Sequence, residues 1–199
     1  RISVDGNLLI GTNAVLQIQP GSLVRLAPGV DMDVFGRLRI EGTWNQPVVF
    51  MPNHSSQPWG GVWVKPGARV EATGLMLTGS GEDQTWFNTH SGFSTHLKEQ
   101  AAFLFDQSSS GAFTNCVITH LEGQVFNGKA ANIRFIRSQY QRASTGGELN
   151  DGSFTASRSH WSEFPDATRT FVDGDNDGIY LNGGQNNVDM CSWGWTKDD

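Results

Sequence analysis

The residues best suited to chemistry in this chain are aspartates near its carboxyl end. Asp173, Asp175 and Asp177 alternate over five positions, and the last two residues are Asp198 and Asp199. Asp177 and Asp198 are 21 residues apart, which is about one turn of a coiled β architecture. Carboxylates one coil apart can lie side by side on one face, where they could act on a sugar, bind a metal ion or cap a turn.

The same aspartates begin like a calcium-binding loop. The segment Asp173–Gly178 has carboxylates at loop positions 1, 3 and 5 and glycine at position 6. Position 12, normally a bidentate Glu, is Gly184, so the segment is not an EF-hand. Because hard oxygen ligands suit Ca²⁺, the sequence predicts a looser calcium site at Asp173, Asp175 and Asp177, completed by the terminal pair or by backbone carbonyls. The alternative is a solvated turn of Asp and Gly.

The elements that must position these carboxylates are short β-strands. The 199 residues include 24 glycines and only 17 % are charged, a composition typical of a β protein with many turns. Apolar and polar residues alternate at 15–19, 23–26 and 38–42, which is the period of a half-buried strand. Pro-Gly pairs at 20–21 and 28–29 provide turns between them. Since no segment keeps a helical period, we predict an all-β chain.

The second half of the chain repeats one pattern. A Gly-rich turn is followed by alternating apolar positions in four segments, at 111–120, 128–137, 151–160 and 184–193. The apolar segments between them are 21 to 23 residues apart, but the last is delayed to about 32, which predicts an inserted loop near 161–175. A second long loop is expected near 80–100, where the rhythm also breaks. Strands this short bury a face only by stacking on copies of themselves, which indicates a solenoid.

Three phrases in the first half carry a resemblance to a known fold. LQIQPGSLVRLAPG, GRLRIEGTWNQPVVF and PWGGVWV resemble the opening coils of right-handed parallel β-helix proteins of the pectin-lyase-like kind. The resemblance extends over most of the chain. It implies an all-β, single-stranded right-handed parallel β-helix, with inward stacks of Val, Ile, Leu and Phe. We expect one such domain over residues 1–199. Both ends look cut, so we expect a fragment of a longer protein, with further domains or a partner chain capping the solenoid.

At the carboxyl end, DNDG followed by DD one coil later resembles the polygalacturonase family of glycoside hydrolases. The resemblance implies that Asp198 or Asp199 protonates the leaving oxygen, while Asp177 and the other terminal Asp activate water. Such inverting chemistry needs carboxyl groups roughly 6.5–9.5 Å apart, which coils stacked about 4.8 Å apart can provide. The chain departs from the family's pattern, because Asn176 stands where Thr is expected and the family's His and basic motifs would follow Asp199.

Charge and hydropathy argue against several partners. The net charge is −6 without a Lys/Arg-rich block, which disfavours nucleic acid and an anionic membrane surface as main partners. No apolar run reaches the roughly 18 residues needed for a membrane span. The order TGGE, EFPD, DNDGIYL and GWTKDD resembles β-helix domains of large bacterial surface or secreted proteins, which implies an extracellular or cell-surface location. Seven tryptophans suit either a packed core or platforms for sugar stacking.

We therefore predict a secreted or cell-surface module that acts on or binds polysaccharide, as a glycoside hydrolase-like β-helix whose carboxylates are Asp177, Asp198 and Asp199. The alternative is a non-catalytic structural or adhesive β-helix, stabilised by calcium. We expect Cys116 and Cys191 to be unpaired, because the first comes early and the second comes late in its strand. The sequence alone does not exclude a disulfide between them.

Overall fold

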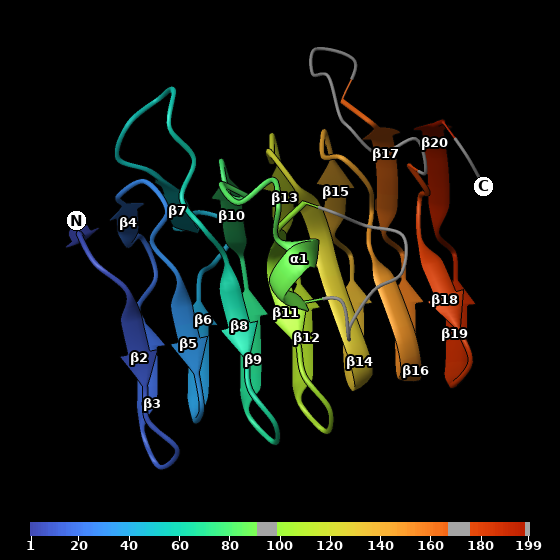
Figure 1. Ribbon diagram of the computed structural model, residues 1–199, viewed down its shortest axis with the longest axis horizontal. Helices are drawn as coiled ribbons and strands as arrows, with labels where there is room; N and C mark the ends of the chain where they lie inside the picture. Colours follow the sequence, from blue (N-terminus) through green and yellow to red (C-terminus); the bar gives the residue numbers. More distant parts are fainter. Residues whose placement is uncertain (91–98, 167–175, 198–199) are drawn as a thin grey trace.

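The chain forms a parallel β-helix (Figure 1). The structure, a computed structural model, describes residues 1–90, 99–166 and 176–197. Strands stack on one another from the first coil to the last, and the one helix in these ranges is the four-residue α1 (Phe87–His90). The predicted all-β parallel β-helix is therefore confirmed. In the part of the chain described, no helix is long and apolar enough to cross a membrane.

The strands form two sheets, and neighbouring strands within each sheet are parallel. The eight-stranded sheet has the order β1 (Ile2–Val4), β4 (Leu23–Leu26), β7 (Val48–Pro52), β10 (Leu75–Thr78), β13 (Val117–Thr119), β15 (Gln139–Gln141), β17 (His160–Phe164) and β20 (Ser192–Thr196). The second sheet runs through β2 (Leu8–Ile10), β5 (Met32–Val34), β8 (Val62–Val64), β11 (Ala101–Phe105) and β14 (Gln124–Ile136), and returns through β12 (Ser110–Thr114), β9 (Arg69–Thr73), β6 (Arg37–Glu41) and β3 (Val15–Ile18). Stacked on β14 is β16 (Glu148–Ser157), which in turn pairs with β18 (Tyr180–Asn182) and β19 (Gln185–Asp189).

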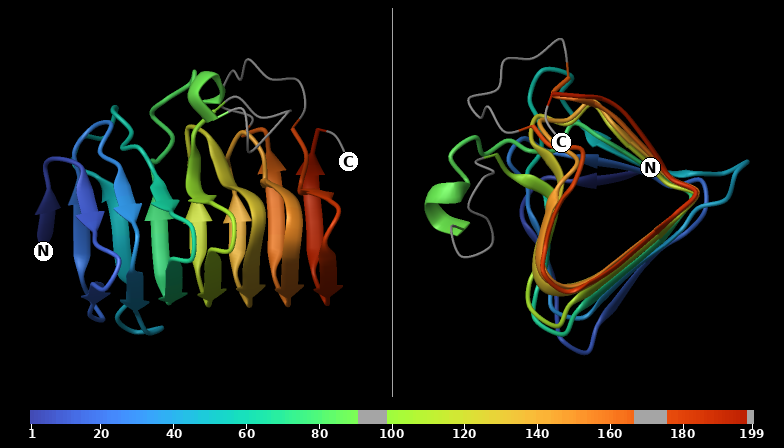
Figure 2. Two further views of the ribbon diagram at one scale, coloured as in Figure 1. Left: turned by 60° about the horizontal axis from the view of Figure 1, so that its bottom comes forward. Right: turned by 90° about the vertical axis from the view of Figure 1, so that its right-hand side faces the viewer.

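Seen along its axis, the solenoid has a triangular outline (Figure 2). The long strands β14 and β16 each pass around one corner and so join two faces into one sheet. At a second corner, the turn is made by one residue with positive φ in each of five coils, namely Gly74, Asn115, Arg137, Arg158 and Met190. The first four donate their backbone N–H to the following coil, as Arg137 does to the Ser157 carbonyl (2.9 Å). We name these five residues the corner column.

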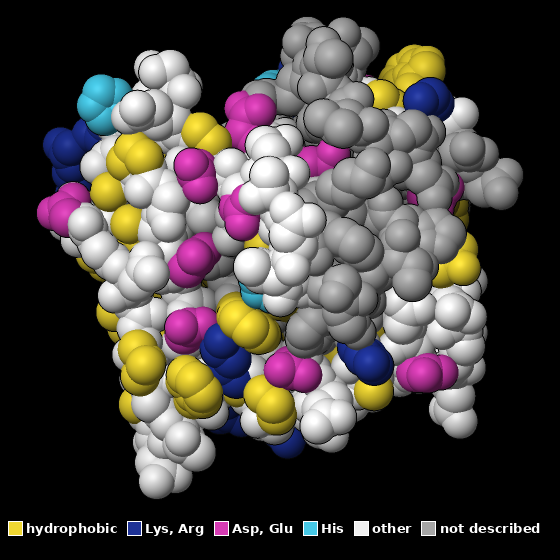
Figure 3. Space-filling view, in the orientation of Figure 1, with side chains coloured by type: hydrophobic (Ala, Val, Ile, Leu, Met, Phe, Trp, Pro, Cys, Tyr) yellow, Lys and Arg dark blue, Asp and Glu magenta, His cyan; other side chains and the backbone are white. Residues whose placement is uncertain are grey.

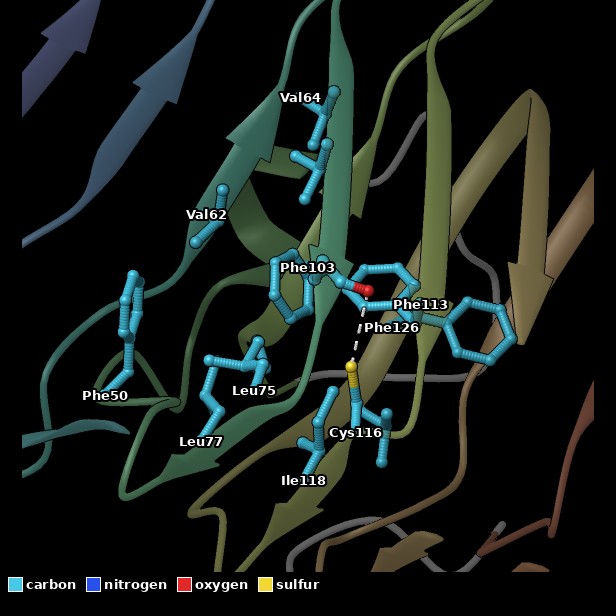
Figure 4. Packing of buried hydrophobic residues seen from close by; sticks show 14 of the residues in the cluster. Phe50, Val62, Val64, Leu75, Leu77, Phe103, Phe113, Cys116, Ile118 and Phe126 are labelled. Carbon is cyan, nitrogen blue, oxygen red and sulfur yellow. Dashed lines mark hydrogen bonds between the residues drawn. The ribbon is translucent and has the colours of Figure 1, made fainter. Parts of the chain in front are cut away.

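The interior is filled by stacks of apolar side chains, as the resemblance implied. Val62, Phe103 and Phe126 form one such stack through three coils, and all three are buried (Figure 4). In the second half of the chain the stacks become aromatic. The Phe135 ring lies 4.6 Å from that of Tyr140 and 5.9 Å from that of Trp161. Residues between the inward positions of each strand face outward, which makes them the positions available for a site.

The register of the strands reproduces the spacing seen in the sequence. Register partners in successive coils are Leu104, Asn127, Glu148 and Tyr180. The steps between them are 23, 21 and 32 residues. The insertion in the long step begins later than expected, because residues 161–164 still belong to β17. Of the loop expected near 80–100, residues 87–90 form α1, while 91–98 and 167–175 lie outside the described residues.

Cys116 and Cys191 are free thiols, but not for the reason that the sequence suggested. They occupy equivalent positions, directly before β13 and β20, and not early and late positions. Ser138 and Ser159 fill the same position in the two coils between them, where the Cys116 N–H donates to Ser138 Oγ (3.1 Å). Three coil steps separate the thiols by roughly 14 Å, too far for a disulfide. Burial raises the pKa of the Cys116 thiol to about 11.

Candidate functional site

Of the aspartates predicted to form the site, the structure describes Asp177. Only 7 % of this residue is exposed, and its backbone carbonyl accepts hydrogen bonds from Thr145 Oγ1 (2.7 Å) and from the Gly146 N–H (3.0 Å). The neighbouring Asn176 is also buried, and its Nδ2 donates to the Ser144 carbonyl (2.8 Å). Asp177 therefore lies at a packed junction between two coils.

The other predicted site residues, Asp173, Asp175, Asp198 and Asp199, lie outside the described residues. Catalysis by Asp177 with the terminal pair, and calcium binding by the alternating aspartates, both stay predictions. Within the described ranges, no three His, Cys, Asp or Glu side chains are grouped so as to hold a metal ion. Thermal melting with and without EDTA checks the calcium site, because an ion bound only to the folded state raises Tm.

A different group of carboxylates gathers on the face shown in Figure 3, over β5 and β8. A hollow of about 330 Å³ lies there, which we name the acidic groove. Its polar and aromatic walls include Asp31, Asp33, Trp63, Glu82, Asp83, Trp86, His90 and Gln100. Outward positions of adjacent strands form its floor, and the segment that follows β10 forms one side.

Asp31 is held in the acidic groove by hydrogen bonds with residues of three other coils. Its Oδ1 accepts from the backbone N–H of Gly61 (3.0 Å) and from Nε2 of Gln100 (2.7 Å). Its own backbone N–H donates to Oδ1 of Asn7 (3.0 Å). These partners belong to the preceding coil and to the next two coils. The stacking of four coils therefore fixes the position of one carboxyl group.

Two glycines allow these coils to approach closely. A Cβ on Gly60 would lie 2.0 Å from Oδ1 of Asp31, and a Cβ on Gly61 would lie 2.3 Å from the carbonyl oxygen of Ala101. Any side chain at either position would displace the backbone or the carboxyl group. The segment PWGGVWV, whose sequence resembles a β-helix coil, thus also provides the two glycines that let the coils meet at the groove.

Desolvation by burial raises the pKa of Asp31 above its ordinary value of 3.8. The hydrogen bonds from Gly61 and Gln100 oppose this shift, because they stabilise the charged form. The negative charges of Asp33 and Asp83 raise the pKa further. The net effect favours the protonated carboxyl, the form in which a side chain can donate a proton to a bound molecule.

Asp33, two residues further along the strand, has different surroundings. Its Oδ1 lies 2.8 Å from Nζ of Lys65, a side chain that is only 12 % exposed. The Lys65 ammonium also lies over the Trp63 ring, which helps to hold it in place. The Lys65 ammonium therefore helps to hold the Asp33 carboxyl group in position. The groove thus places two neighbouring carboxyl groups in different surroundings, one buried and hydrogen-bonded and the other paired with a cation.

An aromatic wall stands beside these carboxyl groups. Oδ1 of Asp83 accepts hydrogen bonds from the backbone N–H (2.8 Å) and hydroxyl (2.9 Å) of Thr85, which orders the turn that leads into α1. The rings of Trp86 and His90 stack at 4.3 Å, and His90 meets the Trp63 ring edge to face at 5.0 Å. Because Trp86 is only 3 % exposed and the Lys65 ammonium lies over the Trp63 ring, these rings form a packed side wall of the groove and not an open stacking surface.

Sequence reasoning missed this site. Asp31 and Asp33 alternate with apolar residues, so they resemble the outward polar positions of any half-buried strand. Gln100 is 69 residues from Asp31, and no motif links the two. The available signal was the Gly60-Gly61 pair directly before β8, since adjacent glycines ahead of a strand mark a close backbone approach.

Comparisons with known proteins add little to this picture. No family model matches the chain, and no curated protein matches it. Among solved structures, the chain is similar to an alginate lyase from a Paenibacillus species, at 10 % identity, with 90 % of this chain and 76 % of that chain covered. The TM-score of 0.29 is too low for this similarity to bear on function. The functional argument therefore rests on the geometry of the groove.

Proposed function

We propose that the acidic groove binds a polysaccharide and hydrolyses it by inversion at the anomeric carbon. Asp31 protonates the leaving glycosidic oxygen, and Asp33 accepts a proton from the attacking water. The observation that carries this proposal is the difference between two neighbouring carboxyl groups. The pKa of Asp31 is raised by burial, whereas Asp33 is paired with Lys65 at 2.8 Å. Two neighbouring carboxyl groups in different surroundings are the usual basis of acid and base assignments.

The two residues are neighbours on one face of the chain. Asp31 and Asp33 lie two positions apart in an extended segment, so their side chains leave the same face and their Cα atoms are about 6.6 Å apart. The inverting reaction requires the two carboxyl groups themselves to be roughly 6.5–9.5 Å apart, which leaves room for a water molecule. Hydrogen bonds from Gly61 and Gln100 hold the Oδ1 atom of Asp31 in a fixed position in the groove.

The charge of the groove restricts the substrate. Asp31, Asp33, Glu82 and Asp83 line it, and Lys65 is paired with one of them. Carboxylates accept hydrogen bonds from sugar hydroxyls but repel sugar carboxylates and sulfates. The substrate that fits is therefore an uncharged or amino-bearing polysaccharide. A secreted or cell-surface location, where such polymers occur, is part of the same proposal.

Sugar release by Asp31→Asn and Asp33→Asn variants tests this function. Each variant should release reducing ends from an uncharged polysaccharide about 10²–10⁴-fold more slowly than the wild type, the usual contribution of a general acid or base. Calorimetric binding of a non-hydrolysed oligosaccharide should change by less than about threefold, because the amide keeps the acceptor oxygen. Asp189→Asn, an exposed aspartate of β19, is the matched control.

Two results would overturn the hydrolase. One is undiminished sugar release by the Asp31→Asn variant. The other is the absence of release by the wild type across a panel of uncharged and amino-bearing polysaccharides. Binding without release would leave the adhesive β-helix as the function of the domain.

A further inference from the structure

A second hollow region follows the corner column, away from the acidic groove. Two adjoining hollows of about 500 Å³ and 570 Å³ share the side chain of Trp44 as a wall. Their lining includes Trp44, Met76, Asn115, Val117, Arg137 and Arg158. We name this region the corner furrow. The loop between β6 and β7, which carries Trp44, extends beyond the corner of the triangle (Figure 2).

Trp44 is held out in solvent by an ordered turn. The residue is 95 % exposed. The turn is closed on both sides, because the Thr43 N–H donates to the Gln46 carbonyl (3.0 Å) and the Gln46 N–H donates to Thr43 Oγ1 (3.1 Å). Exposure of a whole indole to water is unfavourable, and its loss on ligand binding is a source of affinity. Trp44 therefore has the geometry of a stacking platform.

Two exposed arginines continue the furrow along the solenoid. Arg137 and Arg158 occupy successive positions of the corner column, where coils are stacked about 4.8 Å apart. Nε of Arg137 donates to Oδ1 of Asn115 (2.9 Å), which orients the guanidinium. No Asp or Glu of the described residues lines either hollow. An anion lying between the two guanidinium groups is attracted by both.

We propose that the corner furrow binds an anionic polysaccharide. A sugar ring stacks on Trp44, and successive sulfate or carboxylate groups of the polymer bind Arg137 and Arg158. Asn115 and Gln139 provide amide groups for sugar hydroxyls. The acidic groove repels such a polymer, so this site has a ligand and a role separate from those of the proposed hydrolase.

The exposed indole favours a polysaccharide over an acidic peptide. The backbones of the two arginines lie on coils about 4.8 Å apart, and their long side chains can reach anions at a range of spacings. Charge therefore attracts both kinds of polymer. The polysaccharide also has the ring face that can stack on Trp44. Poly-glutamate therefore serves as the competing probe.

Binding of dextran sulfate to the full chain, measured by calorimetry at low salt, tests the proposal. Unmodified dextran shares the backbone but lacks the charge, so any heat that it produces belongs to the acidic groove and should be the same in the Trp44→Ala variant. Trp44→Ala should weaken dextran sulfate binding about tenfold, the loss of one aromatic stacking contact. The double variant Arg137→Gln/Arg158→Gln should weaken it at least as much. Arg134→Gln removes an exposed arginine outside the furrow and should leave the affinity unchanged.

The outcomes separate this site from the acidic groove. Asp31→Asn should not alter dextran sulfate binding, and Trp44→Ala should not alter sugar release. Circular dichroism and Tm show that each variant is folded. Equal losses in the Arg134→Gln and Arg137→Gln/Arg158→Gln variants would overturn the proposal, because they would reveal attraction to general surface charge. Tighter binding of poly-glutamate than of dextran sulfate would overturn it in favour of a protein ligand.

Discussion

The acidic groove and the corner furrow are built on the same coils in two different ways. The groove depends on contacts between coils, because Asp31 is held by the backbone amide of Gly61 and by the side chain of Gln100, each from a different coil. The furrow depends on side chains that project from turns, since Arg137 and Arg158 follow one another at the same corner. One site carries negative charge and the other carries positive charge.

This difference shows how a solenoid can hold two independent sites. A site made by close packing between coils is sensitive to any change in their stacking. A site made by outward side chains tolerates such changes better, because its exposed side chains can adjust to small shifts of the coils. Perturbations of packing, salt, charge pairing and pH should therefore affect the two regions unequally.

A methyl group at Gly60 should produce the largest difference between the two regions. Its Cβ would lie 2.0 Å from Oδ1 of Asp31 and 2.9 Å from the Val30 carbonyl, so the carboxyl group must move. We expect Gly60→Ala to lower sugar release about 10²-fold or more, as misplacement of a catalytic group does. Dextran sulfate binding should be retained. Gly194→Ala is the control, because no atom lies within 4 Å of its Cβ position.

Salt should weaken the furrow far more than the groove. Raising the ionic strength from about 50 to about 300 mM screens exposed charges strongly, so the affinity for dextran sulfate should fall more than tenfold. The affinity of the groove for an uncharged oligosaccharide should change less than about twofold, because its ligand carries no charge. Calorimetric titration at both salt concentrations checks this. Equal salt dependence at the two sites would contradict the comparison.

Removal of the Lys65 ammonium should weaken the groove alone. Lys65→Met keeps the apolar length of the side chain but leaves Asp33 without the cation 2.8 Å away. We expect sugar release to fall about tenfold, because the carboxyl group of the proposed base is less well held in position. Initial rates measured on the purified variant check this. Lys129→Met, at an exposed position of β14, should retain the wild-type rate.

The smallest expected effect is a change in the pH dependence of stability. Burial, and then the charges of Asp33 and Asp83, raise the pKa of Asp31 above 3.8, so the folded chain keeps a proton that the unfolded chain releases. The free energy of unfolding therefore falls as pH rises from 3.8 through the higher folded value. The Asp31→Asn variant has no carboxyl group at this position, so its free energy of unfolding does not fall in this way as the pH rises. Its Tm should exceed that of the wild type by on the order of a few degrees at pH 7 and equal it near pH 3.

The fold could be predicted from the sequence because each strand is marked by a local pattern of apolar and polar residues. Alternation within 23–26 and the Pro-Gly turn at 20–21 are local, and the repeat of 21 to 23 residues reports directly on coil stacking. The aromatic core follows from the same alternation. Local patterns thus determine which residues face inward.

The candidate site could not be predicted in the same way. The contact of Asp31 with Gln100 joins residues 69 positions apart and depends on two intervening coil steps. The prediction instead favoured Asp177, where carboxylates cluster in the sequence. In the structure, Asp177 is buried between two coils, and its backbone carbonyl accepts hydrogen bonds from Thr145 and Gly146. The site predicted from this local cluster of aspartates stays a prediction, whereas the groove depends on contacts between distant coils, which local patterns do not reveal.

The corner column also bears on how such a protein can evolve. Each coil contributes one residue to it, and Asn115, Arg137 and Arg158 are spaced by single repeats of 22 and 21 residues. Duplication of one repeat would lengthen the furrow by one further cation and leave the coils that build the groove untouched. Each added repeat would thus raise the affinity of the furrow for the polymer by one further contact, as each added module does in a multivalent protein. The residues of the groove would stay the same.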